Sequence, residues 1–252
     1  MKVRNSILKT ILMKDFFSQY LEQSRQDVKD KYQYPGPVVT ISRECGCSAK
    51  RIATKLSKIL TGYNYQSETK TDVEWRWVSK EIIEMAAQEL EMDPEKIRNV
   101  FLGETKYSFH ESHNAFLYTD VYDADDQKVI DTTKSVIRNI CEEGHCIIVG
   151  RAASVIAQDI PKRLSVRLQA PLDWRINRIM QISNVSWAEA QEYVLEIDRQ
   201  RNLFVEHVAG RKLENNDFDI IFNYSTLPDD QIVDVIVNVL KNKKIIVNSE
   251  DD

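Results

Sequence analysis

Ten consecutive residues near the start of the chain have the character of a loop that binds phosphate. An apolar, β-branched run precedes them and a helical pattern of apolar residues follows them, which predicts a strand, a turn of small residues and a helix in that order. In this layout the backbone N–H groups of the loop and the helix N-terminus point at an anion. The candidate nucleotide-binding residues are Ser42, Arg43, Glu44, Cys45, Gly46, Cys47, Ser48, Ala49, Lys50 and Arg51.

The usual sequence signature of such a loop is absent. The Walker sequence is Gly, four residues, and then Gly-Lys followed by Ser or Thr. If Lys50 took the Lys position, the two glycines would be Glu44 and Ala49, and the Ser or Thr would be Arg51. An ordinary turn between a strand and a helix therefore remains the alternative interpretation.

Several arginines farther along the chain have the chemistry to bind phosphoryl groups, because a guanidinium donates two parallel hydrogen bonds to phosphoryl oxygens. Arg151 follows Gly150 at the end of a fully apolar run, and open α/β sheets bind their ligands at that end of their strands. Arg178, Arg199 and Arg201 lie on later helical segments. The alternatives are a structural ion pair for Arg151 and a solvated, charged helix for Arg199 and Arg201.

Five apolar segments of strand length alternate with helical patterns, which predicts an α/β fold with a doubly wound parallel sheet and helices on both faces. The predicted strands are 38–41, 73–78, 146–149, 163–168 and 218–223. A long helix is predicted over 127–142. Other helices are predicted to begin with Ser79 as N-cap, with Pro94 in the first position, with a capping box of Ser186 and Glu189, and at Asp229.

The N-terminal segment is predicted to be a separate helical extension over 1–36. Its apolar residues between 6 and 31 fall on one helical face, and Pro35-Gly36-Pro37 ends the pattern. Two roles remain open for this helix: packing on its own domain, or contact with a partner, including a homodimer.

Composition limits the function classes. The chain has 252 residues and a net charge of −5 with interspersed acids and bases, which argues against nucleic acid as a partner. No apolar run approaches the roughly 20 residues that span a bilayer, so we expect no membrane partner and a cytoplasmic location with reduced cysteines. No metal site is expected, because Cys45 and Cys47 lack the usual spacing and His110 and His113 have no third ligand nearby.

Three motifs, in order along the chain, resemble the cytidylate-kinase-like family, a branch of the P-loop nucleoside monophosphate kinases. They are Val39-Thr40-Ile41-Ser42-Arg43-Glu44 followed by Gly46, Ile147-Ile148-Val149-Gly150-Arg151, and Ala170-Pro171-Leu172-Asp173-Trp174-Arg175 followed by Arg178. The resemblance covers about residues 38–240. It implies a five-stranded sheet of the P-loop kinase type within 37–247, with strand order 2-3-1-4-5.

The resemblance also implies an activity, in which ATP with Mg²⁺ donates its γ-phosphoryl group to a nucleoside monophosphate or a related small acceptor. It implies an acceptor-binding region at about 79–143, with Ser79, Gly150 and Arg151 at the acceptor, and a lid at about 175–212. The catalytic residues that it implies, which neutralise charge on the transferring group, are Lys50, Arg151, Arg178, Arg199 and Arg201.

The sequence departs from the family pattern at four points. Ala49 stands at the Walker Lys position, Arg51 stands where a Ser or Thr would bind Mg²⁺, no acid precedes Gly150, and Ala152 replaces an acid associated with base recognition. Two functions therefore stay open. The first is an active phosphotransferase, and the second is a non-catalytic protein of the same fold that binds a nucleotide or a protein partner as a sensor or scaffold.

Overall fold

The computed structural model describes residues 36–66, 73–102 and 124–246. The predicted N-terminal helix and both histidines considered as metal ligands, His110 and His113, lie outside the described residues. No helix of the described part of the chain is both long enough and apolar enough to span a membrane.

Five parallel strands form one sheet in the order β2-β3-β1-β4-β5, which confirms the predicted fold and strand order. The strands are β1 (Val38–Arg43), β2 (Arg76–Val78), β3 (Cys146–Val149), β4 (Arg163–Gln169) and β5 (Ile220–Asn223). In the register, Ile41 lies beside Val149 of β3 and Val166 of β4. The ends of β1, β3 and β4 therefore meet at one edge of the sheet.

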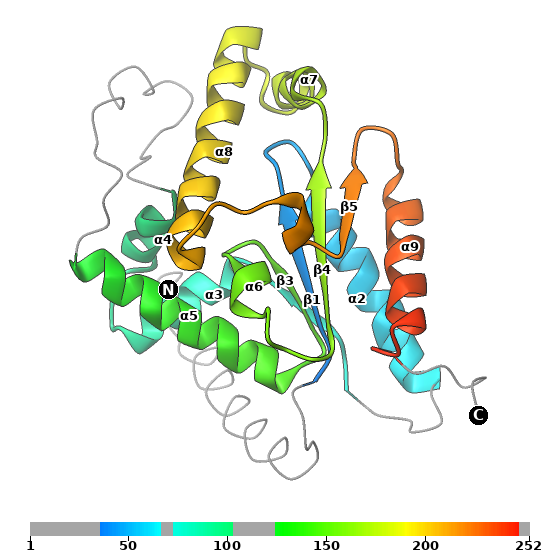
Figure 1. Cartoon of the computed structure of the whole chain (residues 1–252). Coiled ribbons are helices and arrows are strands. Elements are labelled where there is room, and N and C mark those ends of the chain that lie inside the picture. The colour runs from blue at the N-terminus through cyan, green and yellow to red at the C-terminus, as the bar shows by residue number, and fades with distance from the viewer. Residues whose placement is uncertain (1–35, 67–72, 103–123, 247–252) are drawn as a thin grey trace, which may run out of the picture.

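Helices cover both faces of the sheet, because successive strand residues point to opposite sides (Figure 1). Val39 and Ile41 are packed in the core with α2 (Ala49–Gln66) and α9 (Asp229–Asn242). Val38 points the other way, into the core with α3 (Glu81–Glu89), α5 (Ala124–Glu143) and α6 (Ala153–Ile156). The remaining helix on this side is α4 (Pro94–Leu102).

Two helices rise above the carboxyl edge of the sheet, α7 (Leu172–Ser183) and α8 (Trp187–Ala209) (Figure 1). The predicted capping box starts α8, with Ser186 and Glu189 bonding each other's backbone N–H groups. Farther along, α8 contacts α4 and α6, and Phe204 is buried in the core on that side of the sheet. The carboxyl half of α8 is therefore anchored to the body of the protein.

Several element boundaries differ from those predicted. Helix α3 begins at Glu81 with Lys80 at the N-cap, so Ser79 is not the cap; instead, its own N–H donates to Glu81 Oε2 (2.8 Å). Strand β2 starts at Arg76 rather than at residue 73, and β5 starts at Ile220 after a 3₁₀ turn over Asn215–Asp217. The apolar patterns extend beyond the paired residues because Trp75 and Phe218, which precede the two strands, are also buried.

Candidate active site

The loop between β1 and α2 is closed largely by its own hydrogen bonds. Glu44 N–H donates to Leu168 O of β4 (3.0 Å), Cys47 N–H to Glu44 O (3.2 Å) and Ala49 N–H to Cys47 O (3.0 Å). Gly46 takes a positive φ of 91°, which lets the loop turn sharply. Several N–H groups that would face a phosphate in the predicted loop therefore already have protein acceptors.

A carboxylate from α8 reaches this loop. Asp198 Oδ1 accepts a hydrogen bond from Cys45 N–H (2.6 Å), and Asp198 Oδ2 accepts one from Arg175 Nη1 (2.5 Å). Arg175 is only 8% exposed and also lies 3.3 Å from Glu44 Oε2. Arg175 therefore braces the loop against α7 and α8 and is not directed at a ligand.

Three predicted site residues are exposed to solvent or paired with an acidic residue. Lys50 is exposed on the first turn of α2, and Arg51 bonds Asp229 of α9 (Nε to Oδ2, 2.8 Å). On α8, Arg199 is paired in solvent with Glu196 (2.9 Å). The sequence shows that these residues are charged, but the direction of each side chain depends on its position around the helix.

A cavity of about 230 Å³ lies at the carboxyl edge of the sheet, beneath α8. Its lining includes Ser42 and Arg43 from β1, Gly150 and Arg151 after β3, and one face of α8. Ser79 is not among the lining residues; it is 5% exposed beside β2. The basic residues that line the cavity are Arg43, Arg151, Arg167, Arg201 and Lys212.

Arg43 and Arg151 are held together by the turn after β3. Gly150 has a φ of 77° and Arg151 a φ of 58°, so two consecutive residues are in the left-handed region. A Cβ on Gly150 would overlap Nη1 of Arg43 and lie 2.9 Å from its Cζ, so the guanidinium occupies space that only glycine leaves open. Backbone strain of this kind is commonly kept at functional sites.

The electrostatics of the cavity favour an anion. Burial, together with the neighbouring Arg201 and Arg151, lowers the pKa of Arg43 to about 9. Burial also lowers the pKa of Arg151 to about 10, with Arg201 and Arg98 contributing. Both shifts mean that the positive forms are disfavoured here, and a bound anion would reverse that penalty.

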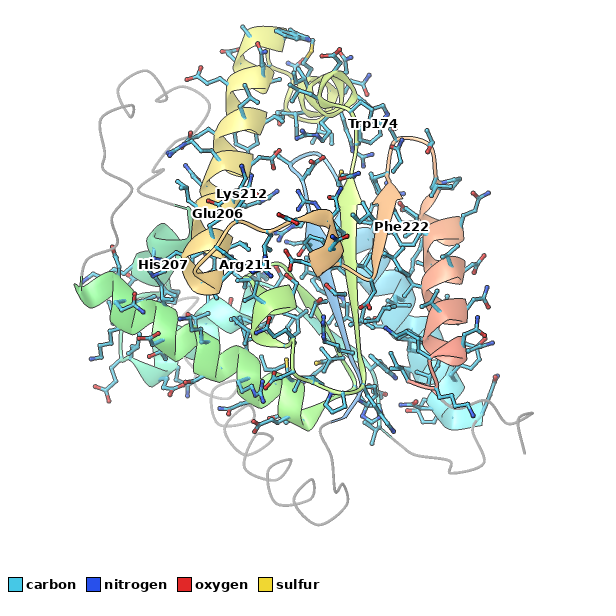
Figure 2. The ribbon with its side chains drawn as sticks, viewed as in Figure 1. Trp174, Glu206, His207, Arg211, Lys212 and Phe222 are labelled. Atoms are coloured by element: carbon cyan, nitrogen blue, oxygen red, sulfur yellow. The ribbon has the colours of Figure 1, made fainter. Side chains whose placement is uncertain are left out.

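On the other side of the loop, Arg178 is held among aromatic rings. Its guanidinium lies 5.1 Å from the ring centre of Trp174 and 5.3 Å from that of Tyr224, and its Nη2 donates to Ser48 Oγ (3.0 Å). Trp174, labelled in Figure 2, and Tyr224 meet edge to face at 6.0 Å. This group can offer a cation and flat rings to a ligand beside the loop.

Several residues of the cavity were not predicted from the sequence, among them Arg167, Glu206, Lys212 and Phe218. Arg167 sits in β4 between two buried residues, Val166 and Leu168, and this polar interruption of an apolar strand was the available signal. Figure 2 shows Glu206 on α8 and Lys212 on the segment that leaves it. Nothing in the local sequence distinguishes these two from solvated charges.

Sequence comparison relates the chain to a known protein family. A model of the cytidylate kinase-like family matches residues 38–226. The chain belongs to the cytidylate kinase-like family. All the residues that line the cavity fall within the matched range.

Two curated proteins, of different function, match parts of the chain. A cytidylate kinase of Sulfolobus acidocaldarius is 31% identical over 83 residues, which are 32% of this chain and 46% of that protein. A uronate isomerase of Corynebacterium glutamicum is 25% identical over 128 residues, 47% of this chain and 24% of the isomerase. This chain therefore spans less than half the length of either curated relative.

A solved structure shares the fold. An uncharacterised protein from Eubacterium ventriosum superposes with a TM-score of 0.56 and 22% identity, over 81% of this chain and 97% of the other. At this identity the likeness concerns the fold alone. The match over residues 38–226 shows the family, and the strand order and this superposition show the fold.

The described residues do not fit a Mg²⁺ site formed by the protein. Arg51, at the place of the usual Ser or Thr, is bonded to Asp229, and the two acids nearest the loop, Glu44 and Asp198, both contact Arg175. Within the described ranges no three His, Cys, Asp or Glu side chains converge as metal ligands. The described residues therefore leave no set of side chains to hold Mg²⁺ directly.

Proposed function

We propose that the protein is a phosphotransferase that moves the γ-phosphoryl group of ATP to a nucleoside monophosphate. The observation that carries the proposal is the convergence of Arg43, Arg151 and Arg201 on one cavity beside the loop. These arginines come from β1, from the turn after β3 and from α8, so only the folded chain brings them together.

The cost of this arrangement supports a role in binding anions. Bringing three guanidinium groups close together in a partly buried place is unfavourable, as the lowered pKa values of Arg43 and Arg151 indicate. A phosphoryl group offers several oxygens to such a cluster, and each arginine can bind it through two hydrogen bonds. We therefore place the phosphoryl group of the acceptor at these three residues.

Catalysis would rest on position and charge. An oxygen of the acceptor phosphoryl group attacks the γ-phosphorus of ATP, the bond to the β–γ bridging oxygen breaks, and its electron pair leaves with ADP. The products are ADP and a nucleoside diphosphate. The arginines stabilise negative charge that spreads over the transferring group, and this chemistry needs no strong general base.

The donor would lie across the loop from this cavity. Ser48 and the start of α2 face that side, and Arg178 is fixed there by its bond to Ser48 Oγ and by the rings of Trp174 and Tyr224. A guanidinium beside flat rings suits both a phosphate chain and a nucleobase. The transferring group would then pass between Arg178 and the arginine cluster.

A specific observation supports a second candidate, a kinase fold that senses or scaffolds without transfer. Asp198 already occupies Cys45 N–H, and Ala49, which is 2% exposed, stands where a Walker Lys would reach the phosphates. A donor phosphate in the same place would meet the negative charge of Asp198. Under this function the chain would bind a monophosphate in the cavity without ATP turnover.

The two candidates are separated by calorimetric titration followed by an assay of nucleoside diphosphate formation. We expect binding of ATP in the presence of Mg²⁺, binding of monophosphates, and formation of diphosphate. Arg151→Ala should lose transfer with little loss of folding stability, because the residue lies in a turn at the strand end. Monophosphate binding without any ATP binding or turnover would favour the sensor, and unchanged turnover of Arg151→Ala would remove Arg151 from the mechanism.

A further inference from the structure

One acidic side chain stands out among the residues that line the cavity. Among the described residues that line the cavity, Glu206 is the only acid, and five others are basic. It is partly buried, and within the described ranges it forms no ion pair or hydrogen bond. The nearby acids are used differently: Asp198 bonds Arg175, and Asp217 bonds Arg211. Glu206 thus keeps both carboxylate oxygens available in a site that favours anions.

The geometry of α8 directs Glu206 into the cavity. On α8, Val205 follows Arg201 by four residues and Glu206 follows Asn202 by four residues, so each pair lies on the same side of the helix, and all four line the cavity. Figure 2 shows Glu206 on α8, near the point where the chain turns toward Lys212. The site therefore has a basic region that includes Arg201 and an acidic point farther along the same helix.

The two ends of the site suit different parts of one ligand. Glu206 follows Arg201 by five positions, which corresponds to a rise of about 7.5 Å along the helix axis. With the phosphoryl group of a nucleotide at Arg201, the ribose would lie short of Glu206, and the nucleobase would lie near it. The cavity lining also includes the apolar residues Phe204, Leu213 and Phe218, which suit a flat, uncharged ring.

A carboxylate at this place can discriminate between ligands by their hydrogen-bonding groups. An ionised Glu only accepts hydrogen bonds, so it favours an amino group and disfavours a carbonyl or phosphoryl oxygen. We infer that Glu206 is the residue that determines acceptor specificity, by accepting a hydrogen bond from the exocyclic amino group of an amino-bearing base. This inference rests on the proposed function, because it takes the phosphoryl group of the acceptor to lie at Arg43, Arg151 and Arg201.

The test compares two monophosphates that differ at a single ring position. CMP carries an amino group where UMP carries a carbonyl oxygen, while the ribose and phosphate are identical. Calorimetric titration of the whole chain should give at least about tenfold tighter binding of CMP, since an unpaired polar group in a binding site is costly. AMP and IMP provide the same comparison on a larger base.

Two variants and a matched control isolate the side chain. In Glu206→Gln the amide can donate to a carbonyl, so the preference for CMP should vanish or reverse; in Glu206→Ala the two affinities should become equal. Glu192→Gln removes a charge from the same helix outside the cavity and should keep the preference of the wild type.

The outcomes separate this inference from the proposed function. Monophosphate binding with the same base ratio in the wild type and both Glu206 variants would overturn the role of Glu206 alone. Equal binding of CMP and UMP by the wild type would overturn it as well. Absence of any monophosphate binding by the wild type would overturn the proposed function and this inference together.

Discussion

Replacing Gly150 by Ala should weaken the binding of a monophosphate to the arginine cluster. Gly150 has a φ of 77°, and a non-glycine residue in the left-handed region costs about 1–2 kcal/mol. The new methyl group would also overlap Nη1 of Arg43, so the guanidinium must leave its place. That movement relieves repulsion with Arg151 and Arg201, so the loss of folding free energy should stay near the backbone cost.

The effect on binding should be larger than the effect on folding. Hydrogen bonds to charged groups contribute about 1.5–3 kcal/mol. Because about 1.4 kcal/mol corresponds to a tenfold change in affinity, Gly150→Ala should weaken monophosphate binding by about 10- to 100-fold. Urea denaturation gives the first quantity and calorimetric titration the second.

Gly210→Ala is the matched control. Gly210 also has a positive φ, 68°, but no atom lies within 4 Å of the position of its added Cβ. It should show a similar loss of stability and no loss of affinity.

A double-mutant cycle with Arg43→Ala then tests the cause. In that background Gly150→Ala should weaken binding no further, because the displaced side chain is already gone. Affinity losses that simply add, or a Gly150→Ala variant that binds like the wild type, would refute the reasoning.

Three other predictions concern the helices above the sheet and the buried groups near it. Arg201→Ala should weaken monophosphate binding at least about tenfold, whereas Arg199→Ala, whose guanidinium is paired in solvent, should bind normally; equal losses would contradict the placement of the cavity. Asp198→Asn should lower the free energy of unfolding by about 1–3 kcal/mol in urea, because Arg175 loses a buried partner, and an unchanged midpoint would argue against that brace. Burial lowers the pKa of His145 to about 4, so the folded state binds a proton more weakly than the unfolded state, and stability should fall as the pH drops from 6.5 to 4, by up to about 3 kcal/mol. His145→Asn, which tolerates the φ of 48°, should remove that pH dependence.

The strand segments and a parallel sheet could be predicted because burial on both faces leaves apolar runs that are visible in the sequence, whereas the strand order was implied by the family resemblance. The runs at 38–41 and 146–149 correspond to β1 and β3, and the capping box at Ser186 marks the start of α8. Family membership was also visible, because its motifs are contiguous in the chain. The ends of the elements were less well predicted. Ser79 was expected to cap α3, but Lys80 is the N-cap, because groups near a helix start determine which residue takes that position.

The sequence by itself determined which residues carry positive charge near strand ends, but not which of these charges converge. Arg43, Arg151 and Arg201 face one cavity, while Lys50, Arg51 and Arg199 project to the surface or pair with acids on helices. The direction of a long side chain depends on the helix face and on partners distant in the chain, such as Asp229 for Arg51. Only the tertiary structure could place Glu206 in one cavity with Arg43 and Arg151, because these residues come from segments that meet only when α8 packs over the sheet.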